Sequence, residues 1–158
     1  MKPYEITKDI FIVGGPDITD GRDGCVYLIN LGELILIDTG AGWSVEKIIN
    51  NIEKFGFDCK NLNKILLTHC HIDHIGGVPE IKKRFDSKIY IHKLDAPPLE
   101  TGDQILTAAK WYQTSFPPTT PSGCEIESSR RNINDWRTED CLPSYTRSYS
   151  GIDMYLFG

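Results

Sequence analysis

A histidine-rich hexapeptide constrains this sequence more than any other feature. Residues 69–74 read HCHIDH, and they hold three of the four histidines in the chain. The preceding run, residues 64–68 (KILLT), is a continuous apolar stretch typical of a buried strand. Hydrolytic zinc sites use imidazole and carboxylate ligands at about 2.0–2.1 Å, so several such side chains must converge on one point. The hexapeptide therefore predicts a metal site at the end of a strand, an edge where layered α/β folds commonly bind ligands.

Spacing divides the four candidate ligands into two pairs. On an extended segment, side chains two residues apart point the same way, so His69 and His71 can bind one ion together. Asp73 and His74 face a second ion only after the chain turns, and the Gly-Gly pair shortly after them permits such a turn. Cys70 points the other way on a strand, which favours a packed thiol over a ligand.

Apolar runs and helical periodicity before residue 116 predict an α/β fold. Strand-length runs rich in β-branched residues alternate with amphipathic stretches. Ser44 fits the N-cap of the first helix, and Gly56 fits a left-handed cap at its carboxyl end. We expect a hairpin turn at residues 30–33, strands at 10–13, 25–29, 34–37, 64–68 and 88–91, and helices at 45–55, 76–84 and 104–112.

Length and charge narrow the class of protein. A chain of 158 residues with 40% hydrophobic residues can bury one core, which predicts a single globular unit. A formal net charge of -5 provides no basic face for nucleic acid. We also expect no membrane segment, because no apolar run approaches the roughly 18–20 residues that span a bilayer. The five cysteines are odd in number and irregularly spaced, which favours reduced thiols in a cytoplasmic protein.

The composition changes after residue 116. Seven of the nine serines lie beyond residue 114, whereas no lysine follows Lys110 and no valine follows Val78. Residues 117–158 carry neither strand nor helix periodicity, so we interpret them as an atypical, loop-rich or disordered tail after a domain at residues 1–116. One hypothesis is that the tail is the gene read in a shifted frame, since suitable codons for residues 128–140 would encode apolar and glycine-rich segments one base later. The gene sequence tests this hypothesis.

The pattern His69-x-His71-x-Asp73-His74 after a buried strand resembles the signature of the metallo-β-lactamase superfamily. The resemblance is strengthened by the Asp-Thr-Gly turn that begins at Asp38. Residues 30–40, 66–77 and 92–111 are similar to the glyoxalase II-like branch of that superfamily. The resemblance implies an αββα sandwich with a dinuclear zinc site, of which this chain would form the first half.

The resemblance also implies a role for each residue of the motif. His69 and His71 would hold the first metal ion, and Asp73 and His74 the second. Asp38 would support the ligands from behind through a hydrogen bond, as metal-bound imidazoles usually require. A metal-bound water would supply hydroxide at neutral pH, with Asp73 orienting it, and the metal ions would polarise the scissile carbonyl. The substrate implied is a small molecule: a thioester, lactone or lactam, with a glutathione-type thioester as the first expectation.

The ligands that complete the family's site have no counterpart here. The family adds a third histidine, a bridging aspartate and a final histidine from the second half of the domain, but this sequence has only His92 after His74. Similar family members often carry a non-ligand histidine at the position of His92. Two alternatives to a zinc hydrolase therefore stay open: a non-catalytic remnant whose exposed face needs a partner, and an iron enzyme similar to a persulfide dioxygenase. A homo-oligomer is compatible with either, and a partner chain could supply the absent ligands.

Overall fold

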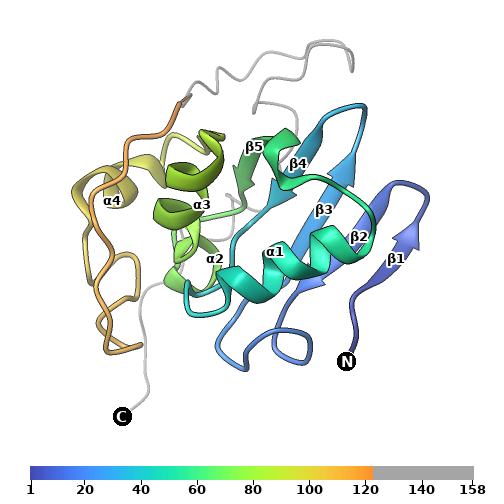
Figure 1. Cartoon of the computed structure of the whole chain (residues 1–158). Helices are drawn as coiled ribbons and strands as arrows, with labels where there is room; N and C mark the ends of the chain where they lie inside the picture. Colours follow the sequence, from blue (N-terminus) through green and yellow to red (C-terminus); the bar gives the residue numbers. More distant parts are fainter. Residues whose placement is uncertain (123–158) are drawn as a thin grey trace.

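The computed structural model describes residues 1–122, and the predicted tail lies almost entirely outside the described residues. Both the boundary at residue 116 and the shifted-frame hypothesis therefore stay predictions. Within residues 1–122, the strands form one mixed sheet in sequential order, as Figure 1 shows. Its strands are β1 (Tyr4–Thr7), β2 (Ile10–Gly14), β3 (Val26–Asn30), β4 (Leu34–Ile37), β5 (Leu62–Leu67) and β6 (Lys88–Ile91).

The sheet changes direction halfway across. Strands β1 to β4 pair antiparallel, whereas β4, β5 and β6 pair parallel. Parallel neighbours end at the same edge, so the residues that follow β4 and β5 come close together. The helices are α1 (Val45–Lys54), α2 (Ile72–Ile75), α3 (Val78–Phe85) and α4 (Ala96–Thr101), with a short 3-10 helix η1 (Cys59–Asn61) before β5. Among the helices of residues 1–122, none is both long and apolar enough to cross a membrane.

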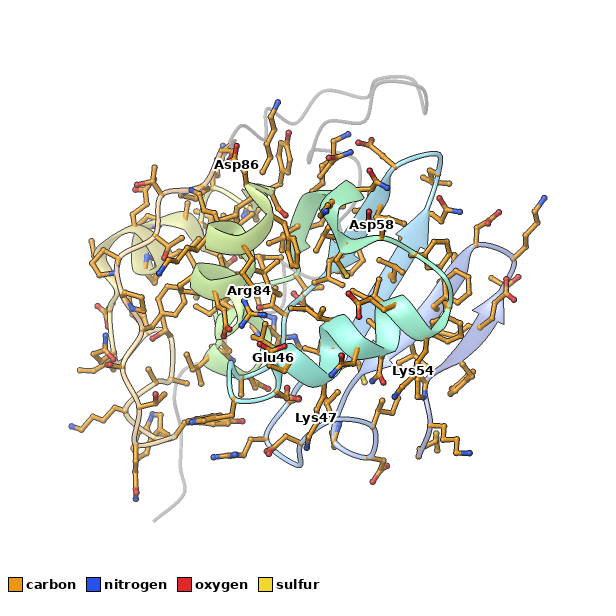
Figure 2. The ribbon with its side chains drawn as sticks, viewed as in Figure 1. Glu46, Lys47, Lys54, Asp58, Arg84 and Asp86 are labelled. Carbon is orange, nitrogen blue, oxygen red and sulfur yellow. The ribbon has the colours of Figure 1, made fainter. Side chains whose placement is uncertain are left out.

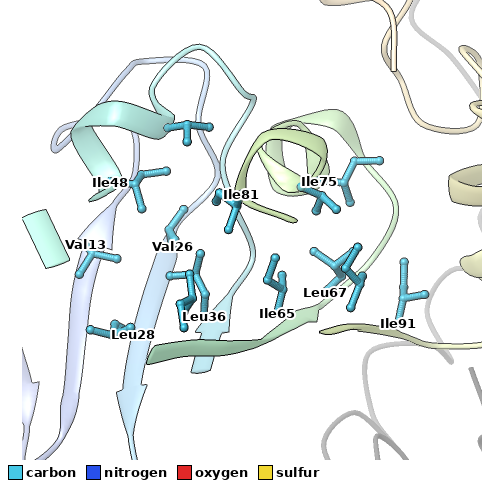
Figure 3. Close-up of a cluster of buried hydrophobic side chains, with 14 of the residues drawn as sticks. Val13, Val26, Leu28, Leu36, Ile48, Ile65, Leu67, Ile75, Ile81 and Ile91 are labelled. Atoms are coloured by element: carbon cyan, nitrogen blue, oxygen red, sulfur yellow. The ribbon is translucent and has the colours of Figure 1, made fainter. Parts of the chain in front are cut away.

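One face of the sheet packs against α1 and α3 and forms the core (Figure 3). Strand register places Phe11, Leu28, Leu36, Ile65 and Ile89 in one row across this face, and each of them is buried. The next row on the same face includes Val13 and Val26. Because inward side chains alternate along a strand, the row between them points to the opposite face. That row is also apolar, but it is only partly buried: Ile12, Tyr27, Ile37, Leu66 and Tyr90.

Most predicted elements are confirmed to within a few residues at each end. The hairpin turn after β3 and the helix from residue 45 are among them, and Gly56 has the expected left-handed backbone with φ of 86°. Ser44 is the residue before α1, but it does not cap the helix with its hydroxyl, which instead donates a hydrogen bond to Asp23. Strand β1 was not predicted, because each of its side chains is exposed and no core face marks it.

The prediction of a helix at residues 104–112 is wrong. The segment forms a series of turns, and the carboxylate of Asp103 accepts hydrogen bonds from the backbone N–H groups of Ile105 and Leu106. The carbonyl of Thr107 accepts a hydrogen bond from the N–H of Ile72, so it bonds to the motif instead of to a helical turn. The helix lies earlier, at α4, where two prolines occupy the first turn and Gly102 ends it with a left-handed backbone.

Candidate metal centre

The motif begins where β5 ends, beside the turn that follows β4. Ile37 of β4 pairs with Leu66 of β5, so Asp38 and Thr68 leave the sheet as neighbours. His69 and Cys70 continue the chain outside the strand, and His71 directly precedes α2 with extended backbone angles. The two elements that carry the sequence motifs therefore meet at one edge of the sheet.

Asp38 connects the two strands to the motif. The residue is 2% exposed, and its backbone φ of 59° lies in the left-handed region that aspartate tolerates. Oδ1 accepts a hydrogen bond of 2.8 Å from the backbone N–H of Thr68, and Oδ2 accepts one of 2.7 Å from the Thr68 hydroxyl. The same Oδ2 lies 2.8 Å from Nδ1 of His74, whose ring it holds in place. The two hydrogen bonds from Thr68 thus fix the carboxylate that orients the imidazole.

The imidazole rings of the motif lie close together. The ring centroid of His69 is 4.7 Å from that of His71 and 4.2 Å from that of His74. Oγ1 of Thr68 lies 3.0 Å from Nδ1 of His69. Because the Thr68 hydroxyl gives its single hydrogen to Asp38, this contact places a hydrogen on Nδ1 of His69. The neutral ring then carries its lone pair on Nε2, the nitrogen through which this tautomer binds a metal.

The second predicted pair has the spacing of two ligands of one ion. Nε2 of His74 lies 3.4 Å from Oδ2 of Asp73. Ligand atoms at about 2.0–2.1 Å from a tetrahedral zinc ion are about 3.3 Å apart, so this distance fits a shared ion. The Nδ1 contact with Asp38 directs Nε2 toward that position. The donor set therefore fits half of a dinuclear site.

Without a metal ion, His74 holds a proton between two carboxylates. Burial lowers the pKa of His74, but the hydrogen bonds and negative charges of Asp38 and Asp73 outweigh burial and raise this pKa to about 10. Burial lowers the pKa of His69 to about 4, with the positive charges of the neighbouring histidines adding to it. Burial opposes the ionisation of Asp73, yet its hydrogen bond to His74 lowers the pKa of this carboxyl. The carboxylates thus attract one cation, and His69 stays neutral, as a metal ligand must be.

Close backbone packing holds the motif helix against the loops around it. Thr39 donates hydrogen bonds to the carbonyl of His74 from its N–H at 2.7 Å and from its hydroxyl at 2.8 Å. The N–H of Gly24 donates to the carbonyl of Asp73 at 2.9 Å. A Cβ at Gly24 would lie 2.6 Å from Cε1 of His74, and a Cβ at Gly76 would lie 2.3 Å from the backbone of Ala41. These positions require glycine because neighbouring atoms fill the space.

Sequence reasoning missed Asp23, a second buried carboxylate close to the motif. It is 3% exposed, and it accepts hydrogen bonds from the hydroxyls of Thr19 and Ser44 and from the N–H of Ala41. A Cβ at Gly40 would lie 2.7 Å from its Oδ1, so Asp23 packs directly under the Asp-Thr-Gly turn. The sequence offers no signal for it, because two other aspartates lie within the same polar loop.

Cys70 and His92 lie outside this arrangement. Cys70 is buried, its Sγ lies 3.7 Å from the carbonyl of Leu106, and burial raises its thiol pKa to about 12. It is the packed thiol that the spacing predicts. His92 follows β6, and its Nδ1 accepts a hydrogen bond of 3.2 Å from the N–H of Leu94. In residues 1–122, no group of three or more His, Cys, Asp or Glu side chains has the arrangement of a complete metal site.

Comparison with known proteins gives the family. The model of the metallo-beta-lactamase superfamily matches residues 19–141, which is well over half of the chain. The chain therefore belongs to the metallo-β-lactamase superfamily.

Individual relatives agree with this assignment, and the chain spans half their length or less. It is 37% identical over 76 residues to the probable metallo-hydrolase YflN of Bacillus subtilis, covering 46% of this chain and 29% of YflN. The metallo-beta-lactamase GOB-18 of Elizabethkingia meningoseptica is similar in structure, with a TM-score of 0.70 and 30% identity over 85% of this chain and 48% of GOB-18. The class B3 enzyme LRA-12 from an Alaskan soil metagenome, described as di-zinc, has a TM-score of 0.67 at 24% identity, over 85% of this chain and 49% of LRA-12. The α/β fold with part of this superfamily's sandwich is thus as predicted.

Proposed function

We propose that this chain is the metal-binding part of a zinc-dependent hydrolase that cleaves a small-molecule thioester, or a related ester, lactone or lactam. The observation that carries the proposal is the chain of contacts from Asp38 to His74 and on to Asp73, with the 3.4 Å spacing that suits two ligands of one ion. A glutathione-type thioester stays our first expectation for the substrate.

The proposed roles are those that the family resemblance implies, and the contacts of Asp38, Thr68, Asp73 and His74 support them. His69 and His71 would bind one ion, and Asp73 and His74 the other, while Asp38 orients His74. When bound, the metal ions would supply a hydroxide nucleophile at neutral pH and polarise the scissile carbonyl. Asp73, half-buried beside His74, would accept a hydrogen bond from the nucleophile and orient it. Thr68 would keep His69 in the tautomer that presents Nε2.

Metal analysis tests this proposal directly. We expect the purified protein to bind zinc, and we expect His69→Ala and His74→Ala to lose it, because each removes half of a ligand pair. His92→Gln is the matched control, since it changes a histidine outside the hexapeptide and should keep the zinc content of the wild type. Unchanged zinc in His69→Ala would mean that the motif does not bind metal in this chain.

A second candidate function is a non-catalytic metal-binding remnant. It is favoured by the absence of a complete ligand group in residues 1–122, since catalytic zinc usually has three protein ligands. Turnover decides between the two: tightly bound zinc with thioester hydrolysis would rule out the remnant, and zinc without hydrolysis would favour it. Iron in protein purified without added metal would instead favour an enzyme similar to a persulfide dioxygenase.

The proposal includes a reducing, cytoplasmic compartment. Among the described residues, Cys25, Cys59 and Cys70 are free thiols. Burial raises the pKa of Cys59 to about 11, so at neutral pH it stays protonated and slow to oxidise. A disulfide found between cysteines of the protein isolated from its native cells would contradict this location.

A further inference from the structure

An aromatic pair borders the motif, and the proposed function does not use it. Trp43 follows the turn of residues 38–42, is 44% exposed, and lies nearly parallel to Tyr112, with an interplanar angle of 14° and ring centroids 6.4 Å apart. This separation lies at the outer end of the range of aromatic pairs, so neither ring fully covers the other. Exposed aromatic surface that is held in place commonly binds a ligand.

Backbone contacts tie both rings to the motif. A Cβ at Gly42 would lie 2.7 Å from the carbonyl oxygen of Gly76, so the residue before Trp43 packs against the chain two residues after His74. The turns that carry Tyr112 are bonded to the motif through Thr107, whose carbonyl accepts a 2.7 Å hydrogen bond from the N–H of Ile72. Burial, then the negative charges of Asp73 and Asp23, raises the pKa of Tyr112, which is consistent with a phenol near the candidate ligands.

Arg22 also packs against the tryptophan ring. Its guanidinium carbon lies 4.0 Å from the centre of the Trp43 ring, within cation–π distance. The same guanidinium makes two hydrogen bonds to the carboxylate of Asp20, at 2.8 and 3.0 Å. The arginine charge is therefore already paired, and it orders the ring without creating a strong site for an anion. An ordered aromatic surface loses little conformational freedom when a ligand binds to it.

We propose that Trp43 and Tyr112 form the acyl-binding wall of the substrate site and select substrates with an uncharged, planar aryl acyl group. This inference rests on the proposed function, because it places the scissile carbonyl at the motif. An aryl group offers flat apolar area to both rings, whereas a small aliphatic acyl group does not reach them equally. An anionic acyl group gains nothing from the wall, since Arg22 is already paired with Asp20.

Kinetics with two thioesters of one thiol, S-benzoyl and S-acetyl, tests the wall in the zinc-loaded protein. For Trp43→Leu and Tyr112→Leu, we expect KM for the benzoyl substrate to rise about ten-fold and KM for the acetyl substrate to change less than about two-fold, in keeping with the worth of an aromatic contact. Trp43→Phe should recover most of the loss. Trp111→Leu is the control, because Trp111 is 76% exposed on the same turns, and it should change neither KM. Equal changes for both substrates, or equal effects of Trp43→Leu and Trp111→Leu, would overturn the inference.

Ligand binding without metal separates this inference from the proposed function. NMR titration with naphthalene-2-carboxamide, a neutral aryl probe, measures binding of an aryl group to the wild-type chain directly. We expect Trp43→Leu to weaken binding about ten-fold and Trp111→Leu to leave it within about two-fold. Wall-dependent binding in a protein with no thioester turnover would support the wall and contradict the hydrolase. Thioester turnover in a protein that binds the probe equally well with and without Trp43 would support the hydrolase and contradict the wall.

Discussion

Two buried carboxylates flank the same turn and have different partners. Asp23 is 3% exposed and Asp38 is 2% exposed. Asp23 accepts a hydrogen bond from the N–H of Ala41 in the turn, and Asp38, the first residue of the turn, accepts one from the N–H of Thr68 after β5. The partners of Asp23 are hydroxyls and a backbone N–H, which are neutral donors within one loop cluster. Asp38 also accepts hydrogen bonds from a backbone N–H and a hydroxyl, both of Thr68, but its Oδ2 contacts the ring of His74 as well.

The comparison separates structural support from support of the proposed metal centre. A buried carboxylate must be hydrogen-bonded in either case, because an unpaired charge is costly in the interior. Asp23 meets this requirement by joining the loop at residues 19–23 to the start of α1. Asp38 meets it while extending a contact toward the motif. Variants of each carboxylate should therefore affect different properties: folding for Asp23, and metal affinity for Asp38.

The largest loss of stability is expected from a substitution at Gly76, which packs against Ala41, a hydrogen-bond partner of Asp23. Gly76→Ala would place Cβ 2.3 Å from the backbone carbon and oxygen of Ala41, whose N–H bonds to Asp23. Overpacking against backbone costs about 3 kcal/mol in the free energy of unfolding. Urea denaturation measures it, with Gly21→Ala as the control, because a Cβ there meets nothing within 4 Å. Equal midpoints for the two variants would mean that the motif segment is not packed as described.

The next largest loss of stability is expected from a substitution of Asp23. Asp23→Ala leaves the donors of Thr19, Ala41 and Ser44 without their acceptor, and each buried unsatisfied donor costs about 1 kcal/mol or more, so a loss of about 2–3 kcal/mol is expected. Zinc affinity of the folded protein should stay within about two-fold of the wild type, since the hydrogen bonds that Asp23 accepts come from Thr19, Ala41 and Ser44. Thermal unfolding and zinc titration are the two measurements. A large fall in zinc affinity at unchanged stability would reverse the roles assigned to the two carboxylates.

Asp38→Asn should give the opposite result. Asparagine keeps one oxygen as an acceptor, but it removes the negative charge that orients His74. Loss of such a supporting carboxylate lowers metal affinity about 10–100-fold. The unfolding midpoint should fall less than in Asp23→Ala, because the side chain keeps its volume and part of its hydrogen bonding. Zinc titration with a competing chelator measures the affinity, and an affinity equal to that of the wild type would remove Asp38 from the proposed centre.

These two residues also show what the sequence can predict. Asp38 was predicted through the family resemblance, because it begins the Asp-Thr-Gly turn, and the apolar pattern contributed only the end of the strand before it. The motif was identified because its ligand types repeat at a spacing that local geometry explains. Whether these side chains bind metal stays a prediction, although the fold brings the rings of His69, His71 and His74 together.

Asp23 could not be predicted, because it depends on contacts between distant parts of the chain. Its loop contains Asp17 and Asp20 as well, and nothing local distinguishes the buried carboxylate from the exposed ones. The same reason explains the wrong prediction of a helix at residues 104–112, where a hydrogen bond from the N–H of Ile72 to the carbonyl of Thr107 competes with helix formation. Helical periodicity is a local signal, and tertiary hydrogen bonds override it.

The smallest effect is expected at an exposed ion pair, which sharpens the contrast with the buried carboxylates. Arg84 of α3 bonds to Glu46 of α1 and to Glu80, and Figure 2 shows Arg84 and Glu46 together on the outer surface of the helices. Water replaces a lost partner at such a site, and holding long side chains in one geometry costs entropy. Arg84→Ala should therefore leave the urea midpoint unchanged within measurement error, although it removes the partner of two carboxylates. Glu46→Ala, which removes one of those carboxylates, should give the same result. A loss comparable to that of Asp23→Ala would mean that bridging α1 and α3 is structurally important, and that burial is not what separates the carboxylates of this protein.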